Sequence, residues 1–414
     1  MRRILYLVPC SPSGRTFGTT LRVRQIGAAL QTLGAIDTVV VSGYDEEEIA
    51  PTTNQFLPVK RLIRLHPVGT RSPMERLRCG ADPTFIGHHG RTTALADRIR
   101  LLRDLPNYDL IWICHLMTAD VFGQWRWPHS VMDLDDVPSE VLRSRMSDGA
   151  TAAERVRAAV RLPVARGRER RLGSRFTTVC VCSDDDARLL RSHRAQVIPN
   201  GFPAPQREPV RSSVDPPRIG FLGTCGYGPN ADAIRWFVHE CWPAIANAHP
   251  AVRLRVAGQG ADDPALIPPH PRIETTGWVA DTEVEMATWT ATIVPVRVGG
   301  GTRVKIAEAL SRKCPIVSTP FGAHGYDAAN GREMLLADSA ADFVAACLKV
   351  VREPAEAHAI AERGWKTFIE KWTWDALQPR VRAAVDECLR RDPPQAHGRL
   401  DAEDAARPRS ARTA

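Results

Sequence analysis

The sequence has ten cysteines but no Cys-x-x-Cys pair, and it has no long apolar run. The first absence argues against a zinc ribbon or a thioredoxin-like redox motif. The second argues against a membrane-spanning helix, which needs about 18 consecutive apolar residues. The apolar run Ile4–Val8 is interrupted at once by Pro9 and Pro12, so it fits a first β-strand better than a signal peptide. We expect a cytoplasmic protein whose cysteines stay reduced.

Lysine is scarce. Only six of the 55 basic residues are lysine, so the positive charge comes mainly from arginine. Against 47 acidic residues the net charge is +8, which fits an anionic partner such as a phosphate, a lipid headgroup or a nucleic acid. A disordered or fibrous chain is excluded, because 43% of the residues are apolar and the mean hydropathy is −0.23.

The chain has no internal repeat of short period, but it has one clear boundary. Five of the fifteen residues in 203–217 are proline, which leaves 202 residues before this stretch and 197 after it. Both halves alternate short apolar runs with helical patterns, so each half predicts a parallel sheet covered by helices. We expect an α/β protein with two Rossmann-like domains, 1–202 and 218–372, that face each other across a cleft and are joined by a stiff linker over 203–217.

The expected elements follow from this alternation. Strands are expected over 3–8, 37–42, 61–65, 109–114, 131–134, 177–182 and 196–198, and then over 218–222, 253–257, 272–276, 291–296, 316–318 and 334–336. Helices are expected over 20–33, 94–105, 230–248, 303–312, 340–351, 355–371 and 374–390. The polar tail 391–414 is expected to be disordered. Functional residues are expected in loops that follow strands, where such sheets bind their ligands.

The strongest functional signal is the segment Pro295–Leu310, in which a strand is followed by three glycines and a helix. Thr302 is a good N-cap for a helix that begins near Arg303. Glycines let a ligand approach the backbone, and the free N–H groups of a helix N-terminus attract anions. Arg303 and Lys305 add positive charge, and Glu308 can accept hydrogen bonds from vicinal hydroxyls one turn further on. The alternative is a surface glycine turn before a helix with a Lys305–Glu308 salt bridge.

This segment and four others, in the same order along the chain, resemble the retaining glycosyltransferases of family GT4, which have the GT-B fold. The other segments are 179–183 with 197–201, 218–223 with 228–233, 254–258 with 276–281, and 372–375. The resemblance covers about residues 1–390 and is strongest over 177–375. It implies an acceptor-binding domain over 1–202, a domain over 218–372 that binds a nucleoside-diphosphate sugar, and a helix over 373–390 that returns to the first domain. It also implies that no metal or other cofactor is bound.

The resemblance, together with the residue patterns, selects the candidate site residues. Catalytic roles are expected for His115, Arg303 and Lys305. Donor binding is expected for Gly14, Gly18, Gly223, Thr224, Trp278, Val279, Gly299, Gly300, Gly301, Thr302 and Glu308. Acceptor binding is expected for Asp135 and Asp136.

The sequence departs from the family pattern at two places. Many family members carry two glutamates on this segment, and the first of them falls on Gly300 here. The usual Arg and Lys after the first strand of the donor domain are also missing from 222–228. We expect Arg303 and Lys305 to supply the missing positive charge. The Gly-Gly-Gly-Thr-Arg-x-Lys variant resembles a subgroup that is linked to polysaccharide biosynthesis.

The candidate residues of the first half have simpler alternative roles. The stretch Cys10–Thr20, with Gly14 and Gly18, resembles the family's glycine loop near the diphosphate, but it can also be an ordinary loop between a strand and a helix. A lone histidine such as His115 is more often structural than catalytic. Asp135 and Asp136 either bind an acceptor hydroxyl or cap the helix that begins near Pro138.

Residues 151–175 hold eight arginines and two glutamates. The interleaved apolar residues predict a basic amphipathic face, Arg155–Arg175, that can dock on an anionic membrane. The alternative is a solvated, arginine-rich helix, and Pro163 and Gly167 are expected to break it.

The sequence therefore predicts a glycosyltransferase that transfers a sugar with retention to a saccharide or lipid-linked acceptor, in the cytoplasm or on the inner face of the plasma membrane. A nucleotide-sugar epimerase of the same architecture, an arginine-rich nucleic-acid-binding protein and an inactive GT-B scaffold are the alternatives. No nucleic-acid partner is expected, because no base-stacking motif accompanies the arginines.

Overall fold

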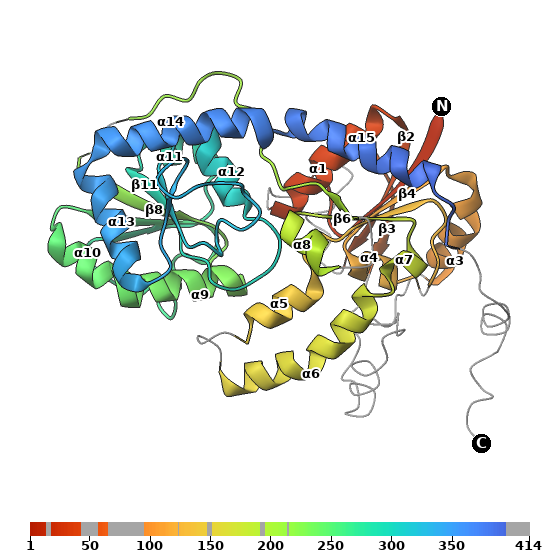
Figure 1. Ribbon diagram of the computed structural model, residues 1–414, viewed down its shortest axis with the longest axis horizontal. Coiled ribbons are helices and arrows are strands. Elements are labelled where there is room, and N and C mark those ends of the chain that lie inside the picture. Colours follow the sequence, from red (N-terminus) through yellow and green to blue (C-terminus); the bar gives the residue numbers. More distant parts are fainter. Residues whose placement is uncertain are drawn as a thin grey trace.

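The computed structural model describes residues 1–13, 18–42, 57–64, 95–122, 124–146, 151–190, 195–212 and 215–394. These residues form two lobes, each built around one sheet in which the paired strands are parallel (Figure 1). We call the lobe of strands β1–β7 the N-lobe and the lobe of strands β8–β13 the C-lobe. The predicted α/β class is confirmed.

The N-lobe sheet has seven strands in the order β3-β2-β1-β4-β5-β6-β7. They are β1 (Arg2–Val8), β2 (Gly34–Ser42), β3 (Val59–Arg64), β4 (Leu110–Cys114), β5 (Ser130–Asp133), β6 (Thr178–Val181) and β7 (Gln196–Val197). The C-lobe sheet has six strands in the order β10-β9-β8-β11-β12-β13. They are β8 (Arg218–Leu222), β9 (Arg253–Ala257), β10 (Ile273–Thr276), β11 (Ala291–Val294), β12 (Ile316–Ser318) and β13 (Leu335–Leu336). Each observed strand overlaps one of the expected strands.

Helices cover the sheets of both lobes. The N-lobe helices are α1 (Gly18–Gln31), α3 (Leu95–Asp104), α4 (Leu116–Asp120), α5 (Pro138–Ser144), α6 (Ala152–Glu169), α7 (Leu172–Arg175) and α8 (Asp184–Leu189), with a 3₁₀ turn, η2, over Leu105–Asn107. The C-lobe helices are α9 (Gly228–Trp236), α10 (Trp242–Ala248), α11 (Thr282–Ala287), α12 (Val304–Ser311), α13 (Ala340–Arg352) and α14 (Pro354–Lys371). The last helix, α15 (Trp374–Arg390), follows α14 along the top of the molecule to the N-lobe (Figure 1).

Two expectations about helices are wrong. The single helix expected over 230–248 is divided by a π-helical turn, η3 (Phe237–Cys241), because Pro243 in the first turn of α10 has no N–H for a regular helical hydrogen bond. The helix break expected at Pro163 and Gly167 does not occur, and α6 runs through both residues. Because Ala159, four residues before the proline, is exposed, water can satisfy the carbonyl that Pro163 leaves without a donor.

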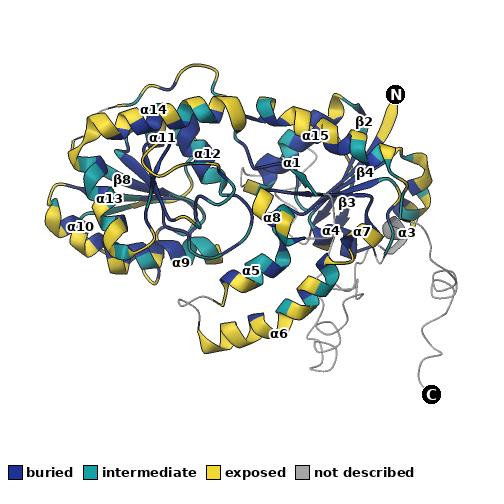
Figure 2. Cartoon of the chain, in the orientation of Figure 1, coloured by how far each residue is buried: buried dark blue, intermediate teal, exposed yellow. Residues whose placement is uncertain are grey.

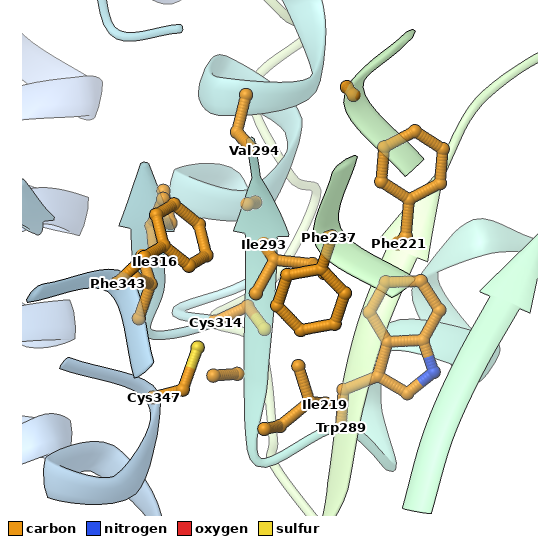
Figure 3. Packing of buried hydrophobic residues seen from close by; sticks show 14 of the residues in the cluster. Ile219, Phe221, Phe237, Trp289, Ile293, Val294, Cys314, Ile316, Phe343 and Cys347 are labelled. Carbon is orange, nitrogen blue, oxygen red and sulfur yellow. The ribbon is translucent and has the colours of Figure 1, made fainter. Parts of the chain in front are cut away.

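The C-lobe core lies on both sides of its sheet (Figure 3). The rings of Phe237 and Phe343 meet edge to face, with centroids 5.9 Å apart. Gly220 in β8 makes room for Trp289, since a Cβ atom on this glycine would lie 2.0 Å from the indole ring. The buried strands and the exposed outer helix faces are plain in Figure 2.

The helix α15 is part of the N-lobe core. Its buried residues Trp374, Leu377 and Val381 pack in one cluster with Ile4 and Tyr6 of β1. The C-terminal end of the described chain is therefore fixed on the N-lobe, although α14 belongs to the C-lobe.

The two chain crossings between the lobes lie side by side. The Phe202 amide donates to the Trp372 carbonyl at 3.0 Å, and the Trp374 amide donates to the Phe202 carbonyl at 3.3 Å. A Cβ atom on Gly201 would lie 2.6 Å from the Trp372 carbonyl oxygen, so this close approach requires glycine. Further along the linker, Arg211 donates to the Met286 carbonyl at 3.2 Å, which holds this part of the linker on the C-lobe.

Candidate active site

The strand orders place the candidate residues at matching positions of the two lobes. The order reverses between β1 and β4 in the N-lobe and between β8 and β11 in the C-lobe, and ligands of such sheets bind at these points. His115 directly follows β4, Gly223 directly follows β8, and the triple glycine lies in the loop after β11. Gly18 begins α1 after the loop that follows β1. The loops from the two lobes meet, as the contacts below show.

The loop after β11 is built around Arg303. The guanidinium donates through Nη1 to the carbonyls of Gly300 and Gly301, and it lies over the Phe321 ring at 5.3 Å from the centroid. Two further guanidinium nitrogens, Nε and Nη2, are buried and have no hydrogen-bond partner among the described residues. Burial lowers the pKa of Arg303. The side chain therefore keeps unused donors for an anion.

The start of α12 differs from the expected one. Arg303 is the N-cap residue, without a capping side-chain hydrogen bond, and the helix begins at Val304. The hydroxyl of Thr302, expected to cap the helix, instead accepts a hydrogen bond from the Asn200 amide of the N-lobe at 3.1 Å. The first N–H groups of α12 consequently have no side-chain cap from their own loop. The Ile306 amide donates to the Arg303 carbonyl at 2.8 Å, whereas those of Val304 and Lys305 remain available to a ligand.

Lys305 lies next to the first loop of the C-lobe. Its Nζ donates to Asn230 Oδ1 at 2.9 Å and sits 4.3 Å from the Phe221 ring centroid. A Cβ atom on Gly223 would lie 3.1 Å from Nζ, so the absence of a side chain there gives the amine its space. Burial lowers the pKa of Lys305 to about 7, and the nearby Arg303 adds to the shift. Lys305 therefore supplies positive charge beside the first loop of the C-lobe, as expected, but the fraction of charged amine depends on pH.

The remaining expected donor residues outside this loop also lie in the C-lobe. Glu308 accepts a hydrogen bond from the Thr282 hydroxyl at 2.5 Å, and burial raises the pKa of its carboxyl. Lys305 and Glu308 thus have separate partners instead of the alternative salt bridge. The Thr224 carbonyl accepts from Asn230 Nδ2 at 3.0 Å. Val279 packs against the C-lobe core, whereas the neighbouring Trp278 is 45% exposed.

The N-lobe contributes a histidine and two carboxylates. His115 and Asp135 have positive φ angles, 65° and 53°, which cost free energy and are concentrated at functional sites in proteins. The Nε2 atom of His115 lies 3.8 Å from Asp135 Oδ2. Burial and the neighbouring Asp135 raise the pKa of Asp136 to about 6. No described residue donates a hydrogen bond to the Asp136 side chain, so this carboxyl group can accept one from a ligand hydroxyl.

The alternative capping role of the two aspartates is wrong. The N-cap residue of α5 is Val137, and no side chain caps the helix there. The amide of Ser139 donates instead to Glu169 of α6, at 2.6 Å.

The lobes touch in the described structure, and the triple glycine makes one of the contacts. The Gly299 amide donates to Ser144 Oγ of α5 at 2.8 Å. A Cβ atom on Gly301 would lie 2.5 Å from Asp136 Oδ1, and one on Gly300 would lie 2.6 Å from Val141 Cγ2. The structure therefore brings the glycines, Arg303 and Asp136 together between the lobes.

Gly18 also lies at this interface. A Cβ atom on Gly18 would lie 3.4 Å from Val304 Cγ2, at the start of α12. Its neighbour in the expected glycine loop, Gly14, lies outside the described residues.

Three polar residues near the site were not singled out from the sequence. Arg22 of α1 makes a two-pronged ion pair with Asp133, with the shortest contact at 2.7 Å. The sequence feature that could have identified Arg22 is its position on the apolar face of α1, in line with Ile26 and Leu30. Asn200 and Asn230 lie in segments that carry the family resemblance, but nothing in the sequence connects Asn230 to Lys305, 75 residues away.

The described residues contain neither a cluster of metal-ligating side chains nor a helix that could cross a membrane. No group of three or more His, Cys, Asp or Glu side chains in these residues is arranged to hold a metal ion. None of the helices in the described ranges has the length and apolar character that crossing a bilayer requires.

Comparisons with known proteins bear on the family of the C-lobe and on the fold. Residues 216–353 match the family described as "Glycosyl transferases group 1". No curated protein matches the sequence.

Solved structures similar to the whole chain include several glycosyltransferases. Anabaena HepE, solved in complex with UDP-glucose, has a TM-score of 0.61 at 14% identity, and the match covers 93% of this chain and 100% of HepE. Sucrose-phosphate synthase from Thermosynechococcus elongatus has a TM-score of 0.66 at 15% identity, over 92% of this chain and 98% of that one. WaaG, described as a glycosyltransferase involved in lipopolysaccharide biosynthesis, has a TM-score of 0.59 at 12% identity, over 92% and 99%. These findings support a group 1 glycosyltransferase domain over 216–353 and a GT-B fold for the chain.

Proposed function

We propose that the chain is a retaining glycosyltransferase of the GT4 type that moves a sugar from a nucleoside-diphosphate sugar to a hydroxyl of a saccharide or lipid-linked acceptor. The observation that carries the proposal is the pair of half-buried cations, Arg303 and Lys305, at the uncapped N-terminus of α12. A diphosphate bound at this N-terminus would lie beside both side chains, and Arg303 has two unpartnered guanidinium nitrogens among the described residues.

The proposed reaction needs charge stabilisation at the leaving group. When the bond between the anomeric carbon and the β-phosphate oxygen breaks, negative charge develops on that phosphate. Arg303, Lys305 and the first amides of α12 are fixed in place before the reaction, so they stabilise this charge without reorganising. The acceptor hydroxyl attacks on the same face of the sugar and gives its proton to the departing phosphate oxygen. No covalent intermediate on the protein is required.

The N-lobe residues would bind and orient the sugar and the acceptor. Asp136 has an unoccupied carboxyl group between the lobes, and the His115–Asp135 pair lies beside it. We assign Asp136 to a substrate hydroxyl and His115 to the transferred sugar. Closure of the lobes over the substrates would exclude water and limit hydrolysis of the donor.

The donor can be found by thermal unfolding with a panel of UDP-, GDP- and ADP-sugars, because a bound ligand raises the apparent stability. UDP-sugars come first, since HepE was solved with UDP-glucose. Transfer is then measured with saccharide acceptors, and the anomeric configuration of the product tests retention. We expect chelation of divalent metals with EDTA to leave the rate unchanged, because Arg303 and Lys305 neutralise the diphosphate.

The decisive variant is the double substitution Arg303→Ala with Lys305→Ala. Loss of one such charge-stabilising donor lowers kcat by about 100- to 1000-fold in other enzymes, so the double variant should show no measurable transfer. The matched control is Lys349→Ala with Arg352→Ala, which removes the same residue types from the exposed side of α13. Circular dichroism checks that both variants fold.

The alternatives give different results in the same experiments. Transfer by the Arg303/Lys305 variant at the wild-type rate would contradict the proposal. An epimerase would convert a nucleotide-sugar without any acceptor. A nucleic-acid-binding protein would ignore nucleotide-sugars and lose affinity steeply with salt. An inactive scaffold would bind a donor and never turn it over.

We also infer that the protein acts in the biosynthesis of cell-surface polysaccharide or glycolipid, at the cytoplasmic face of an anionic membrane. The support is the exposed N-terminal part of α6, where Val156 is 63% and Val160 is 69% exposed among arginines. Apolar side chains surrounded by arginine are the features that bind an interfacial helix to anionic lipid.

A further inference from the structure

Asn200 is a buried residue whose side chain bonds mainly within the N-lobe, with one longer hydrogen bond, at 3.5 Å, from its Nδ2 to the Thr302 carbonyl of the C-lobe. It is 4% exposed and lies just before the chain crosses to the C-lobe. Its Oδ1 accepts a hydrogen bond from Arg22 Nη1 at 2.9 Å, and its Nδ2 donates to Asp135 Oδ1 at 2.8 Å. The amide plane is therefore fixed between the Arg22–Asp133 ion pair and the Asp135 carboxylate.

The backbone of the same residue is held by the C-lobe. The Asn200 amide donates to Thr302 Oγ1 at 3.1 Å, and its carbonyl lies 3.0 Å from the Tyr326 hydroxyl. Tyr326 Oη also lies 3.1 Å from the Arg303 carbonyl, so the same hydroxyl contacts the phosphate-binding loop. These contacts require the lobes to be closed, because Thr302 and Tyr326 belong to the C-lobe and Asn200 follows the last strand of the N-lobe.

Asn200 holds the carboxylate of Asp135, and this carboxylate faces His115. Asp135 has a φ of 53° and no regular element to fix it. One of its carboxylate oxygens takes hydrogen bonds from Asn200 and from the Cys182 thiol, and the other lies 3.8 Å from His115 Nε2. The orientation of this carboxylate therefore depends on the Asn200 amide.

We propose that Asn200 is a positioning residue that links closure of the two lobes to the orientation of Asp135 and, through Asp135, of His115. When the lobes separate, Asn200 loses the Thr302 and Tyr326 contacts and its amide is free to turn away from Asp135. Asp135 is therefore held in the orientation that faces His115 only when the C-lobe is closed on the N-lobe. This inference rests on the proposed function, because it concerns the same site.

The test is Asn200→Asp, which keeps the size of the side chain and the oxygen that accepts from Arg22. It replaces the donor that faces Asp135 with an oxygen, and so places two carboxylates together. We expect kcat to fall about 100-fold, the usual cost of a misplaced catalytic group. We expect KM for the donor to change by less than about twofold, since the phosphate-binding residues are untouched. Asn330→Asp makes the same chemical change at an exposed asparagine of the C-lobe and should leave both constants unchanged.

A second pair of variants tests the link to closure. Tyr326→Phe removes the hydroxyl that contacts Asn200 and keeps the buried ring. If Asn200 acts through closure, the effects of Asn200→Ala and Tyr326→Phe on kcat are not additive. Small-angle scattering with a bound nucleoside diphosphate should show a larger radius of gyration for Asn200→Asp than for the wild type.

The outcomes separate the two proposals. If the wild type and Asn330→Asp transfer no sugar, the proposed function fails, and scattering still decides the inference about Asn200. If the wild type transfers sugar and Asn200→Asp keeps its kcat, or if both proteins have the same radius of gyration, the inference about Asn200 is overturned. Additive effects of Asn200→Ala and Tyr326→Phe would overturn it as well.

Discussion

At the scale of single residues, the two cations of the site respond differently to pH. Burial lowers the pKa of both side chains, but a guanidinium begins so high that Arg303 keeps its charge at every physiological pH. Lys305, with a pKa of about 7, is largely neutral in weakly alkaline solution when the site is empty. A bound diphosphate favours the charged amine, so binding of the donor takes up a proton.

This difference predicts that affinity for the nucleoside diphosphate falls as the pH rises above 7. As the pH rises, Lys305 is neutral in a larger fraction of the molecules. The affinity should therefore fall by up to about tenfold per pH unit, until the pH reaches the pKa of Lys305 in the bound state. Calorimetry in buffers of different ionisation enthalpy measures both the affinity and the proton uptake. Lys305→Met should bind weakly with little dependence on pH, and Lys349→Met, a half-exposed control on α13, should behave as the wild type. A wild-type affinity that stays constant from pH 7 to 9 would refute this role of Lys305.

The same burial determines how Lys305 affects folding. Its pKa in the folded protein is lower than the 10.5 of a free lysine, so between pH 7 and 10.5 the unfolded chain binds more protons at this residue. Stability rises with pH under that condition, and the contribution of Lys305 to the free energy of unfolding is therefore least favourable below pH 7. Substituting Lys305 should not destabilise the fold, which makes its variants usable for activity measurements.

Gly300 shows why a single residue departs from the family pattern. A Cβ atom there would lie 2.6 Å from Val141 Cγ2 and 3.0 Å from Asp136 Oδ1. A glutamate at this position is therefore incompatible with the described contact between the lobes. The carboxyl group beside the loop is supplied instead by Asp136 from the opposite lobe. The sequence showed that the glutamate was missing, but the residue that fills its space is 164 positions away and follows from the tertiary structure.

At the scale of elements, the α5–α6 hairpin connects the surface with the site. At the site end, Ser144 of α5 accepts the Gly299 amide. At the other end, Glu169 of α6 holds the start of α5, and Arg168 lies 3.5 Å from the buried Asp120. These contacts fix the C-terminal half of α6 and leave its N-terminal half exposed (Figure 2). An acceptor held by a membrane at α6 would therefore be close to the glycine loop.

We predict that vesicles with anionic lipid bind the protein through the N-terminal half of α6. Replacing Arg155, Arg157 and Arg161 with glutamate should reduce sedimentation with such vesicles by about tenfold or more, since each basic residue contributes about 1 kcal/mol at an anionic surface. The matched control replaces Arg103, Arg235 and Arg382, three exposed arginines on other helices, with glutamate. Equal loss of binding in both triple variants would indicate a general charge effect and reject α6 as the docking element. The wild type should not bind neutral vesicles.

The elements also mark the limit of what the sequence predicts. Every strand in the described residues was predicted, because apolar runs are local signals that survive burial, as in Ile4–Val8. The start of α12 was misplaced by one residue because the Thr302 hydroxyl binds Asn200, which is 102 residues away. The break at Pro163 was wrong because exposure of the preceding turn to water is not visible in the sequence. Local chemistry predicts elements, whereas distant partners determine where they begin and end.

At the scale of the whole molecule, polar contacts join the two lobes at separate places. Asn200, Thr302 and Tyr326 form one group, close to the two chain crossings. Ser144 and Gly299 form a second group at α5. The sequence predicted two facing domains and located several of these loops at strand ends. It could not predict which side chains meet, because each pair joins residues more than 100 positions apart.

A third contact between the lobes contains a histidine, and it makes the closed arrangement depend on pH. His324 of the C-lobe lies 3.1 Å from Ser183 Oγ, 3.6 Å from Asp185 and 3.9 Å from Asp186 of the N-lobe. The Asp186 carboxylate raises the pKa of His324, while Arg303 opposes the shift. A histidine whose pKa is raised on folding stabilises the protein fully below its unfolded pKa of 6.5, and this contribution is lost as the pH rises through the folded pKa.

We therefore predict that His324→Asn lowers the free energy of unfolding at pH 6 by up to about 1 kcal/mol, the range of partly exposed ion pairs, and changes it little at pH 8.5. The radius of gyration of the ligand-free wild type should be larger at pH 8.5 than at pH 6, because the contact between the lobes at His324 weakens. Asp185→Asn removes one charged partner without touching the cap of α8, which Ser183 provides, so it should reproduce part of the effect. His358→Asn changes an exposed histidine of α14 and should have no effect at either pH. Equal destabilisation by His324→Asn at both pH values would mean that the ring acts by packing, and that closure of the lobes does not respond to its charge.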